Sequence, residues 1–186
     1  NMPGAMMSMA RLNIPSVFVY GGAILPGPYK GKDINIQDMF EAVGAYAKCQ
    51  ITLDELTDME RVACPGEGAC SGMFTANTMA CISEAMGLAL TYSAMPPAVE
   101  SYNSSNISNE RKNYGIDAGK AVMNLIEKNI RPRDIVTIES LRNAAVVVAA
   151  TGGSTNAALH LPAIANEAGI KFNLRDVVEI YQSTPY

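Results

Sequence analysis

The chain has 186 residues, of which 48% are hydrophobic and 17% are charged. This size and composition are typical of one globular domain with its own core, or of part of a larger protein. Asp and Glu (18) outnumber Lys and Arg (14), and no basic run occurs, which argues against nucleic acid or an anionic membrane surface as a partner. A small molecule or another protein remains as the partner.

The longest apolar runs, such as Ala144–Ala150, are much shorter than the roughly 18 residues that a membrane span needs. No signal peptide opens the chain, so we expect a cytoplasmic or organelle-matrix location. The chain begins Asn-Met-Pro-Gly, without an initiator Met, and we therefore expect a piece of a longer protein.

The first quarter of the chain predicts a strand, a loop and a helix. Residues 16–22 (SVFVYGG) are β-branched and aromatic, which predicts a buried strand. Residues 23–34 are rich in Pro, Gly and Lys and predict an exposed loop. Residues 36–48 predict a helix, because apolar residues recur there at helical spacing: Ile36, Met39, Phe40, Val43 and Ala47.

Two further helices are expected on either side of a glycine-rich turn. Residues 52–62 predict a short helix, because Thr52 and Glu55 are spaced as a capping box. Pro65 and two glycines then interrupt the chain, and a helix is expected over 71–89 with one apolar face: Met79, Ile82 and Met86.

The second half of the chain predicts helices and one short strand. A polar loop is expected over 93–107, followed by helices over 108–128, 139–150 and 156–168 and after the cap residue Asn173, with a strand over 134–137. So many helices and only two strand candidates predict the α-rich share of an α/β layer architecture, with further strands outside this chain.

Residues 64–79 (CPGEGACSGMFTANTM) carry the clearest chemical signal. The two glycines suggest a phosphate loop, but neither established phosphate-loop pattern is present. Cys70 would lie just before the expected helix, whose N-terminal field favours the thiolate that a soft metal requires. Cys64 is six residues earlier, does not have C-x₂-C spacing, and precedes Pro65 in a segment without such a field. We therefore predict Cys70 as a metal ligand whose partners lie elsewhere in the fold.

Three segments in the same order resemble the dihydroxy-acid/phosphogluconate dehydratase family: residues 1–4 (NMPG), 64–79, and 152–170 (GGSTNAALHLPAIANEAGI). Members of this family are much longer. The resemblance therefore implies that residues 1–186 are a fragment of a single N-terminal, cluster-binding domain with a three-layer α/β/α fold, and that the C-terminal domain is absent. The fragment is expected to be inactive alone.

The implied activity is that of an iron–sulfur hydro-lyase, which converts 2,3-dihydroxy carboxylic acids to 2-oxo acids in isoleucine and valine biosynthesis. Cys70 matches one of three ligating cysteines, and a Cys-Asp-Lys triplet expected immediately before Asn1 supplies another. That triplet also provides ligands for Mg²⁺, and the catalytic base lies outside this chain too, so no catalytic residue is expected here. Both [2Fe–2S] and [4Fe–4S] clusters stay open, with [2Fe–2S] favoured. The resemblance also implies a homodimer.

The resemblance and the residue pattern also suggest an active-site lining. We expect Asn1 and the turn Gly153, Ser154, Thr155 and Asn156 to lie near the substrate, because a Gly-Gly turn before a helix N-terminus can bind a carboxylate. The alternative is that the polar residues of this turn simply cap the helix.

The remaining candidate residues are interpreted structurally. Cys64 is expected to be a structural thiol near the site, Cys49 and Cys81 to pack within helices, and His160 to be a hydrogen-bonded core residue. Without a secretory signal, none of these cysteines suggests a disulfide framework.

Two alternative functions stay open. One is a sugar-acid dehydratase of the same family, although residues 64–79 favour the branched-chain enzyme. The other is a non-enzymatic anion-binding module in which Gly66–Cys70 form the binding turn, and phosphate would then bind saturably without metal.

Overall fold

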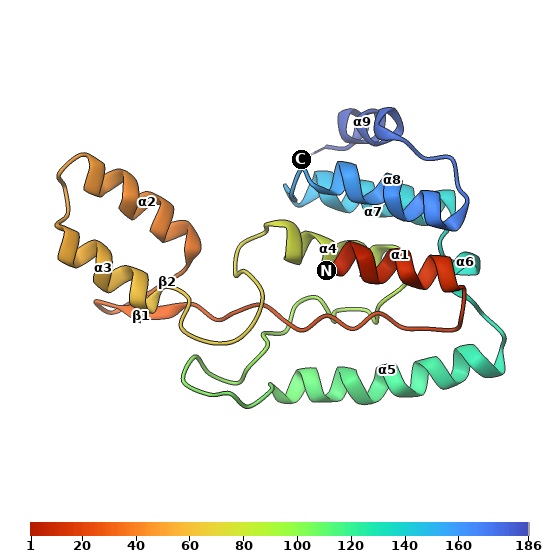
Figure 1. Cartoon of the computed structure of the whole chain (residues 1–186), viewed down its shortest axis with the longest axis horizontal. Coiled ribbons are helices and arrows are strands. Elements are labelled where there is room, and N and C mark those ends of the chain that lie inside the picture. The colour runs from red at the N-terminus through yellow and green to blue at the C-terminus, as the bar shows by residue number, and fades with distance from the viewer. Residues whose placement is uncertain (186) are drawn as a thin grey trace. The chain divides into compact units, whose positions relative to one another are not determined.

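Nine helices and one two-stranded sheet make up the regular structure of residues 1–185, the part of the chain that the computed structural model describes (Figure 1). The chain divides into two compact units. The first contains residues 1–20 and 73–94 and the chain from Lys112 onward, and the second contains residues 21–72 and 95–111.

The first unit is a helical assembly. Its helices are α1 (Met2–Leu12), α4 (Thr75–Ala85), α6 (Pro132–Ile135), α7 (Ile138–Ala150), α8 (Ala157–Ala168), α9 (Leu174–Ser183) and most of α5 (Asn109–Glu127). Helix α1 packs on α8, while α7 packs against α4, α8 and α9. The core consists of fully buried side chains from these helices: Met6, Met79, Ile82, Leu141, Leu161, Ile164 and Val177. Burial of each such side chain contributes about 1.5–3 kcal/mol, so this interface holds the helices together.

Capping residues fix where several of these helices begin. The Thr137 side chain accepts a hydrogen bond from the Ser140 N–H at the start of α7, and Asn173 accepts one from the Arg175 N–H at the start of α9. Such bonds satisfy backbone donors that have no partner within the helix. The helices expected over 139–150 and after Asn173 are thereby confirmed.

The second unit contains a helical hairpin and a β-hairpin. Helices α2 (Ile36–Ala47) and α3 (Leu53–Val62) lie side by side, and the antiparallel strands β1 (Gly27–Tyr29) and β2 (Lys32–Ile34) pair Gly27 with Ile34 (Figure 1). The predicted capping box of α3 is present, because the Thr52 hydroxyl accepts from the Glu55 N–H at 3.2 Å. The helix expected over 36–48 is confirmed, although Phe40 and Val43 of its apolar stripe remain 62% and 55% exposed.

Both predicted strands are wrong, and the loop predicted over 23–34 contains the β-hairpin. Residues 16–22 form no strand: Phe18 makes an isolated parallel bridge with Ala89, and Gly22 has a positive φ of 99°. Residues 134–137 overlap α6 instead, because Pro132 suits a first helical turn and the Asp134 carboxylate accepts from the Arg131 N–H at 2.8 Å. Helix α1 forms over residues 2–12, where the sequence pattern predicts no element.

These elements make the described chain helix-rich with one small sheet, as expected of a mixed α/β domain. None of the helices within residues 1–185 is both long enough and apolar enough to cross a bilayer.

Candidate functional site

The loop after α3 carries Cys64 and Cys70 and is fixed through its backbone. The Ala69 N–H donates to the Gly22 carbonyl at 2.9 Å, and the Ile24 N–H donates to the Ala69 carbonyl at 2.6 Å. Ala23 also forms isolated bridges with both Ala69 and Pro97. Residue 69 is therefore held on both sides, and Cys70 follows it directly.

Gly68 has a conformation and a packing that only glycine permits. Its φ of +138° lies in a region that side chains rarely adopt, and a Cβ there would come within 2.5 Å of the Ile24 nitrogen. At Gly66 the nearest atom to an added Cβ, the Tyr102 oxygen, would lie 3.4 Å away, which is an ordinary contact. The second glycine of CPGEGAC, Gly68, thus lets the loop approach residues 22–24. This packing explains the presence of glycine there without a phosphate-binding role.

Cys70 does not lie at a helix N-terminus. The helix expected from residue 71 begins at Thr75 with Phe74 as its N-cap, so the predicted start is wrong. Cys70 therefore lies four residues before the N-cap of α4 in the sequence. What the structure does show is a half-buried Cys70 in a loop with a fixed backbone.

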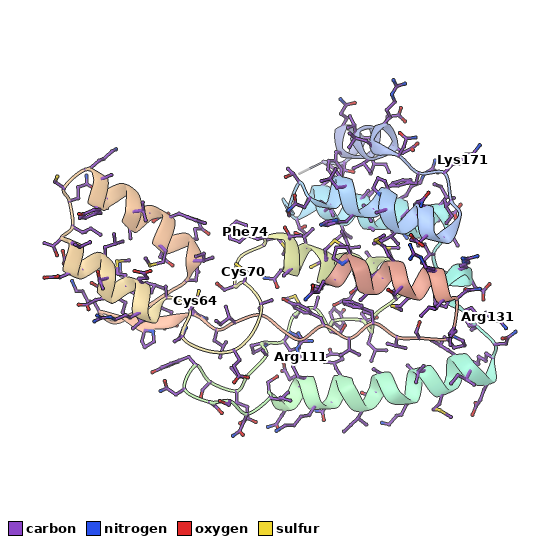
Figure 2. All side chains as sticks on the ribbon, in the orientation of Figure 1. Cys64, Cys70, Phe74, Arg111, Arg131 and Lys171 are labelled. Atoms are coloured by element: carbon purple, nitrogen blue, oxygen red, sulfur yellow. The ribbon has the colours of Figure 1, made fainter. Side chains whose placement is uncertain are left out.

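Cys64, and not Cys70, contacts a helix N-terminus, that of α2. Partial desolvation raises the pKa of the Cys64 thiol, and the neighbouring Cys70 sulfur raises it further. A hydrogen bond from the N–H of Ile36, the first residue of α2, opposes this rise. The expectation that Cys64 lacks a helix field is therefore wrong. Figure 2 shows both cysteines on the loop that follows α3.

Ser71 lies beside these thiols with a buried hydroxyl. The hydroxyl is near enough to the Cys64 sulfur to lower the pKa of that thiol, yet Ser71 Oγ makes no hydrogen bond of normal geometry with any described residue. The Ser71 hydroxyl is therefore close to the Cys64 sulfur but is not oriented to form a hydrogen bond with it. A buried polar atom without a partner costs about 1–3 kcal/mol, so this hydroxyl requires an explanation.

In the first unit, the turn over residues 152–156 meets the start of α4. The Thr75 and Ser154 hydroxyl oxygens are 3.1 Å apart, and Asn156 Nδ2 donates to Thr75 Oγ1 at 2.8 Å. The Ser154 N–H donates to Thr78 Oγ1 at 2.9 Å. A Cβ on Gly153 would lie 3.0 Å from Thr78 Cγ2, so glycine gives this turn its close approach to α4. Within the first unit, the start of α4 and the 152–156 turn are thus joined by hydrogen bonds.

These contacts bear on the alternative that the turn only caps α8. The N-cap residue Asn156 makes no side-chain capping bond, because its amide is directed to Thr75. Backbone carbonyls of the turn accept from the first N–H groups of α8, including Ala158 N–H to Thr155 O at 3.1 Å. The Ser154 hydroxyl does accept from the Asn156 N–H at 3.2 Å, so Ser154 supports the start of α8 as the capping alternative expects, whereas the Asn156 side chain does not.

Asn1 and His160 lie close to each other within the first unit. Asn1 is the exposed N-cap of α1, and its carbonyl accepts from the Ala5 N–H at 3.0 Å. Partial burial lowers the pKa of His160 on α8, and the positive charge of the Asn1 amino group lowers it further. His160 is half-buried, and no hydrogen bond of its side chain is seen within residues 1–185, so the predicted core hydrogen bond is not observed.

The other two cysteines take different places. Cys49 is exposed and lies in the turn after α2 with a φ of 55°, so its expected place within a helix is wrong. Cys81 is half-buried within α4, as predicted, and burial raises the pKa of its thiol. Within residues 1–185, no three His, Cys, Asp or Glu side chains are grouped to hold a metal ion.

Ser71 in the second unit and Thr75 in the first are not predicted from the sequence as candidate residues. Both lie inside the segment CPGEGACSGMFTANTM, but hydroxyl residues carry no spacing signal of their own. Their roles depend on contacts across the fold, which only the structure reveals.

The chain is similar over residues 1–186 to the family described as dihydroxy-acid/6-phosphogluconate dehydratase, N-terminal, and it belongs to that family. It is 62% identical over 186 residues to dihydroxy-acid dehydratase of Pelagibacter ubique, and 60% identical to that of Parvibaculum lavamentivorans. The archaeal relative from Sulfurisphaera tokodaii is 56% identical over 183 residues.

These matches cover the chain almost completely but the relatives only in part. The alignments include 100%, 100% and 98% of this chain, respectively, and 31% of each relative. The chain therefore spans about a third of the length of the curated relatives that it matches.

Proposed function

We propose that this chain forms part of an iron–sulfur hydro-lyase that converts a 2,3-dihydroxy carboxylic acid to a 2-oxo acid. Membership of the dehydratase family and the names of the similar relatives support this activity. The observation that carries the proposal is the anchored CPGEGAC loop, in which two backbone hydrogen bonds at Ala69 and the packing of Gly68 fix the position of Cys70. Fixing the main chain beside a thiol is how a protein pre-organises a metal ligand.

The residues around Cys70 fit an iron–sulfur cluster. Thiolates are the usual ligands of such clusters, Cys70 is partly accessible, and a second thiol, Cys64, lies close by. The buried Ser71 hydroxyl adds a hydrogen-bond donor, and no described residue accepts a hydrogen bond of normal geometry from it. Cys70 would hold the cluster, which when bound supplies an iron that acts as a Lewis acid. The other cluster ligands, those of Mg²⁺ and the catalytic base would come from the rest of the protein, and [2Fe–2S] is the favoured cluster.

We assign the carboxylate of the substrate to the start of α4 and the 152–156 turn. The first N–H groups of an α-helix have no partner within the helix and can bind an anion, and Phe74, the N-cap of α4, makes no side-chain capping bond to them. The Thr75 and Ser154 hydroxyls stand beside them and would orient the acid. Gly153, Thr155 and Asn156 would complete this lining, with Asn1 at the start of α1 as a further candidate.

Several properties of the whole protein follow from the same resemblance. We propose a homodimer, a role in isoleucine and valine biosynthesis, and a three-layer α/β/α domain to which this chain contributes mainly helices. A sugar-acid dehydratase is the second candidate, because the family description includes 6-phosphogluconate dehydratase.

Product analysis of the full-length protein tests this proposal. After anaerobic purification with Mg²⁺, it should release a 2-oxo acid from 2,3-dihydroxyisovalerate much faster than from 6-phosphogluconate. The reverse preference would establish the sugar-acid alternative, and turnover of neither by a cluster-loaded protein would refute the proposed reaction.

A further inference from the structure

The Ser71 hydroxyl is a chemical group of the anchored loop for which the described residues provide no well-aligned partner. Its oxygen is buried, and none of these residues gives it a hydrogen bond of normal geometry. Buried hydroxyls are normally satisfied, so an exception beside a candidate ligand points to a partner that binds there.

The backbone gives this hydroxyl a defined position. Ala69 is fixed by hydrogen bonds to Gly22 and Ile24, and Ser71 follows it by only two residues. Ser71 is adjacent to Cys70 in the chain and close to the Cys64 sulfur in space. The Cys64 sulfur is within interaction range of both the Cys70 sulfur and the Ser71 hydroxyl, so a group bound through Cys70 would lie in the same part of the loop as the Ser71 O–H.

We propose that Ser71 donates a hydrogen bond from Oγ to an iron-bound sulfur, either the Cys70 thiolate or a sulfide of the cluster. This inference rests on the proposed function, because it requires the cluster. Hydrogen bonds to cluster sulfurs stabilise the more negative, reduced state and thereby raise the reduction potential. Ser71 is thus a positioning and tuning residue and not a catalytic one.

The test uses the full-length enzyme, purified without oxygen, as wild type and as five variants, one of which is Cys70→Ser. Ser71→Ala and Ser71→Gly remove the hydroxyl, and Ser71→Thr keeps it. Ser16→Ala is the matched control, because Ser16 Oγ is also buried without a hydrogen bond but lies in the other unit. The readouts are the midpoint potential of the cluster and the exchangeable proton couplings of the reduced cluster, measured by electron–nuclear double resonance in H₂O and D₂O.

We expect one strong exchangeable coupling in the wild type, Ser71→Thr and Ser16→Ala, and its loss in Ser71→Ala and Ser71→Gly. The midpoint potential should shift to more negative values in the same two variants and stay unchanged in Ser16→Ala. Full cluster content with wild-type coupling and potential in either hydroxyl-free variant would overturn the inference. A wild type without any cluster, or a Cys70→Ser variant that keeps its cluster, would instead refute the proposed function.

Discussion

At the scale of one residue, Gly68 allows the CPGEGAC loop to pack against residues 23 and 24. Its φ of +138° and the 2.5 Å approach of an added Cβ to the Ile24 nitrogen leave no room for a side chain. We predict that Gly68→Ala lowers the stability of this loop by about 1–3 kcal/mol, the usual cost of such backbone strain, and reduces the cluster content of the full-length enzyme. Thermal unfolding and iron analysis measure the two effects.

Gly66→Ala in the same loop is the control for this prediction. An added Cβ there meets the Tyr102 oxygen at 3.4 Å, so stability and iron content should stay near those of the wild type. Equal behaviour of the two variants would show that Gly68 is not required for the loop conformation.

At the scale of elements, caps and buried faces were the parts that the sequence could predict. Thr52 and Asn173 mark the starts of α3 and α9, because a side-chain acceptor must satisfy the first N–H groups of a helix. The apolar face of α4 was also predicted, and Met79, Ile82 and Met86 are buried. These signals are local and therefore visible without the fold.

The start of α4 and the strand over 16–22 were predicted wrongly because neither is determined by the local sequence. Phe74 makes no side-chain capping bond, so nothing in the local sequence marks the true helix start. The 16–22 segment has strand-like residues, but strand formation depends on a partner, and only Phe18 finds one, at Ala89. The field at Cys64 likewise comes from α2, which is distant in the chain.

The cap of α2 offers a prediction at this scale. Asn35 Oδ1 accepts from the Gln37 N–H at 2.8 Å, and the Asp38 carboxylate accepts from the Asn35 N–H at 2.7 Å. We expect Asn35→Ala to destabilise α2 by about 1 kcal/mol, whereas Asn35→Asp keeps a capping acceptor and most of the stability. Hydrogen exchange of the α2 amides gives the local stability directly. Equal protection in both variants would contradict the capping role.

At the scale of the whole molecule, the chain contains only part of the proposed site. The resemblance implies three cysteine ligands, of which this chain supplies Cys70, and the chain matches 31% of the length of its relatives. The proposed cofactor and substrate are inferred from the sequence only through that resemblance. The hydroxyl contact of Thr75 with Ser154 arises from folding and has no local sequence signal.

We therefore predict that residues 1–186 alone have no dehydratase activity, even after anaerobic reconstitution with iron and sulfide. One ligating thiolate cannot retain a cluster that needs several, and the catalytic base is expected outside this chain. Assay of 2-oxo acid release, with the full-length enzyme as positive control, measures this. Turnover of 2,3-dihydroxyisovalerate by the isolated chain would place the active site within it.

The central claim is that Cys70 ligates the cluster, and it can be tested by comparing two single substitutions in the full-length enzyme. Cys64→Ser is the matched control, because Cys64 lies on the same loop, close to Cys70. A serine hydroxyl is a poor replacement for a thiolate on iron. The measurement is the visible absorbance of the anaerobically purified variants together with their activity. We predict that Cys70→Ser loses both and that Cys64→Ser keeps substantial absorbance and turnover; a colourless Cys64→Ser beside a brown, active Cys70→Ser would contradict the account.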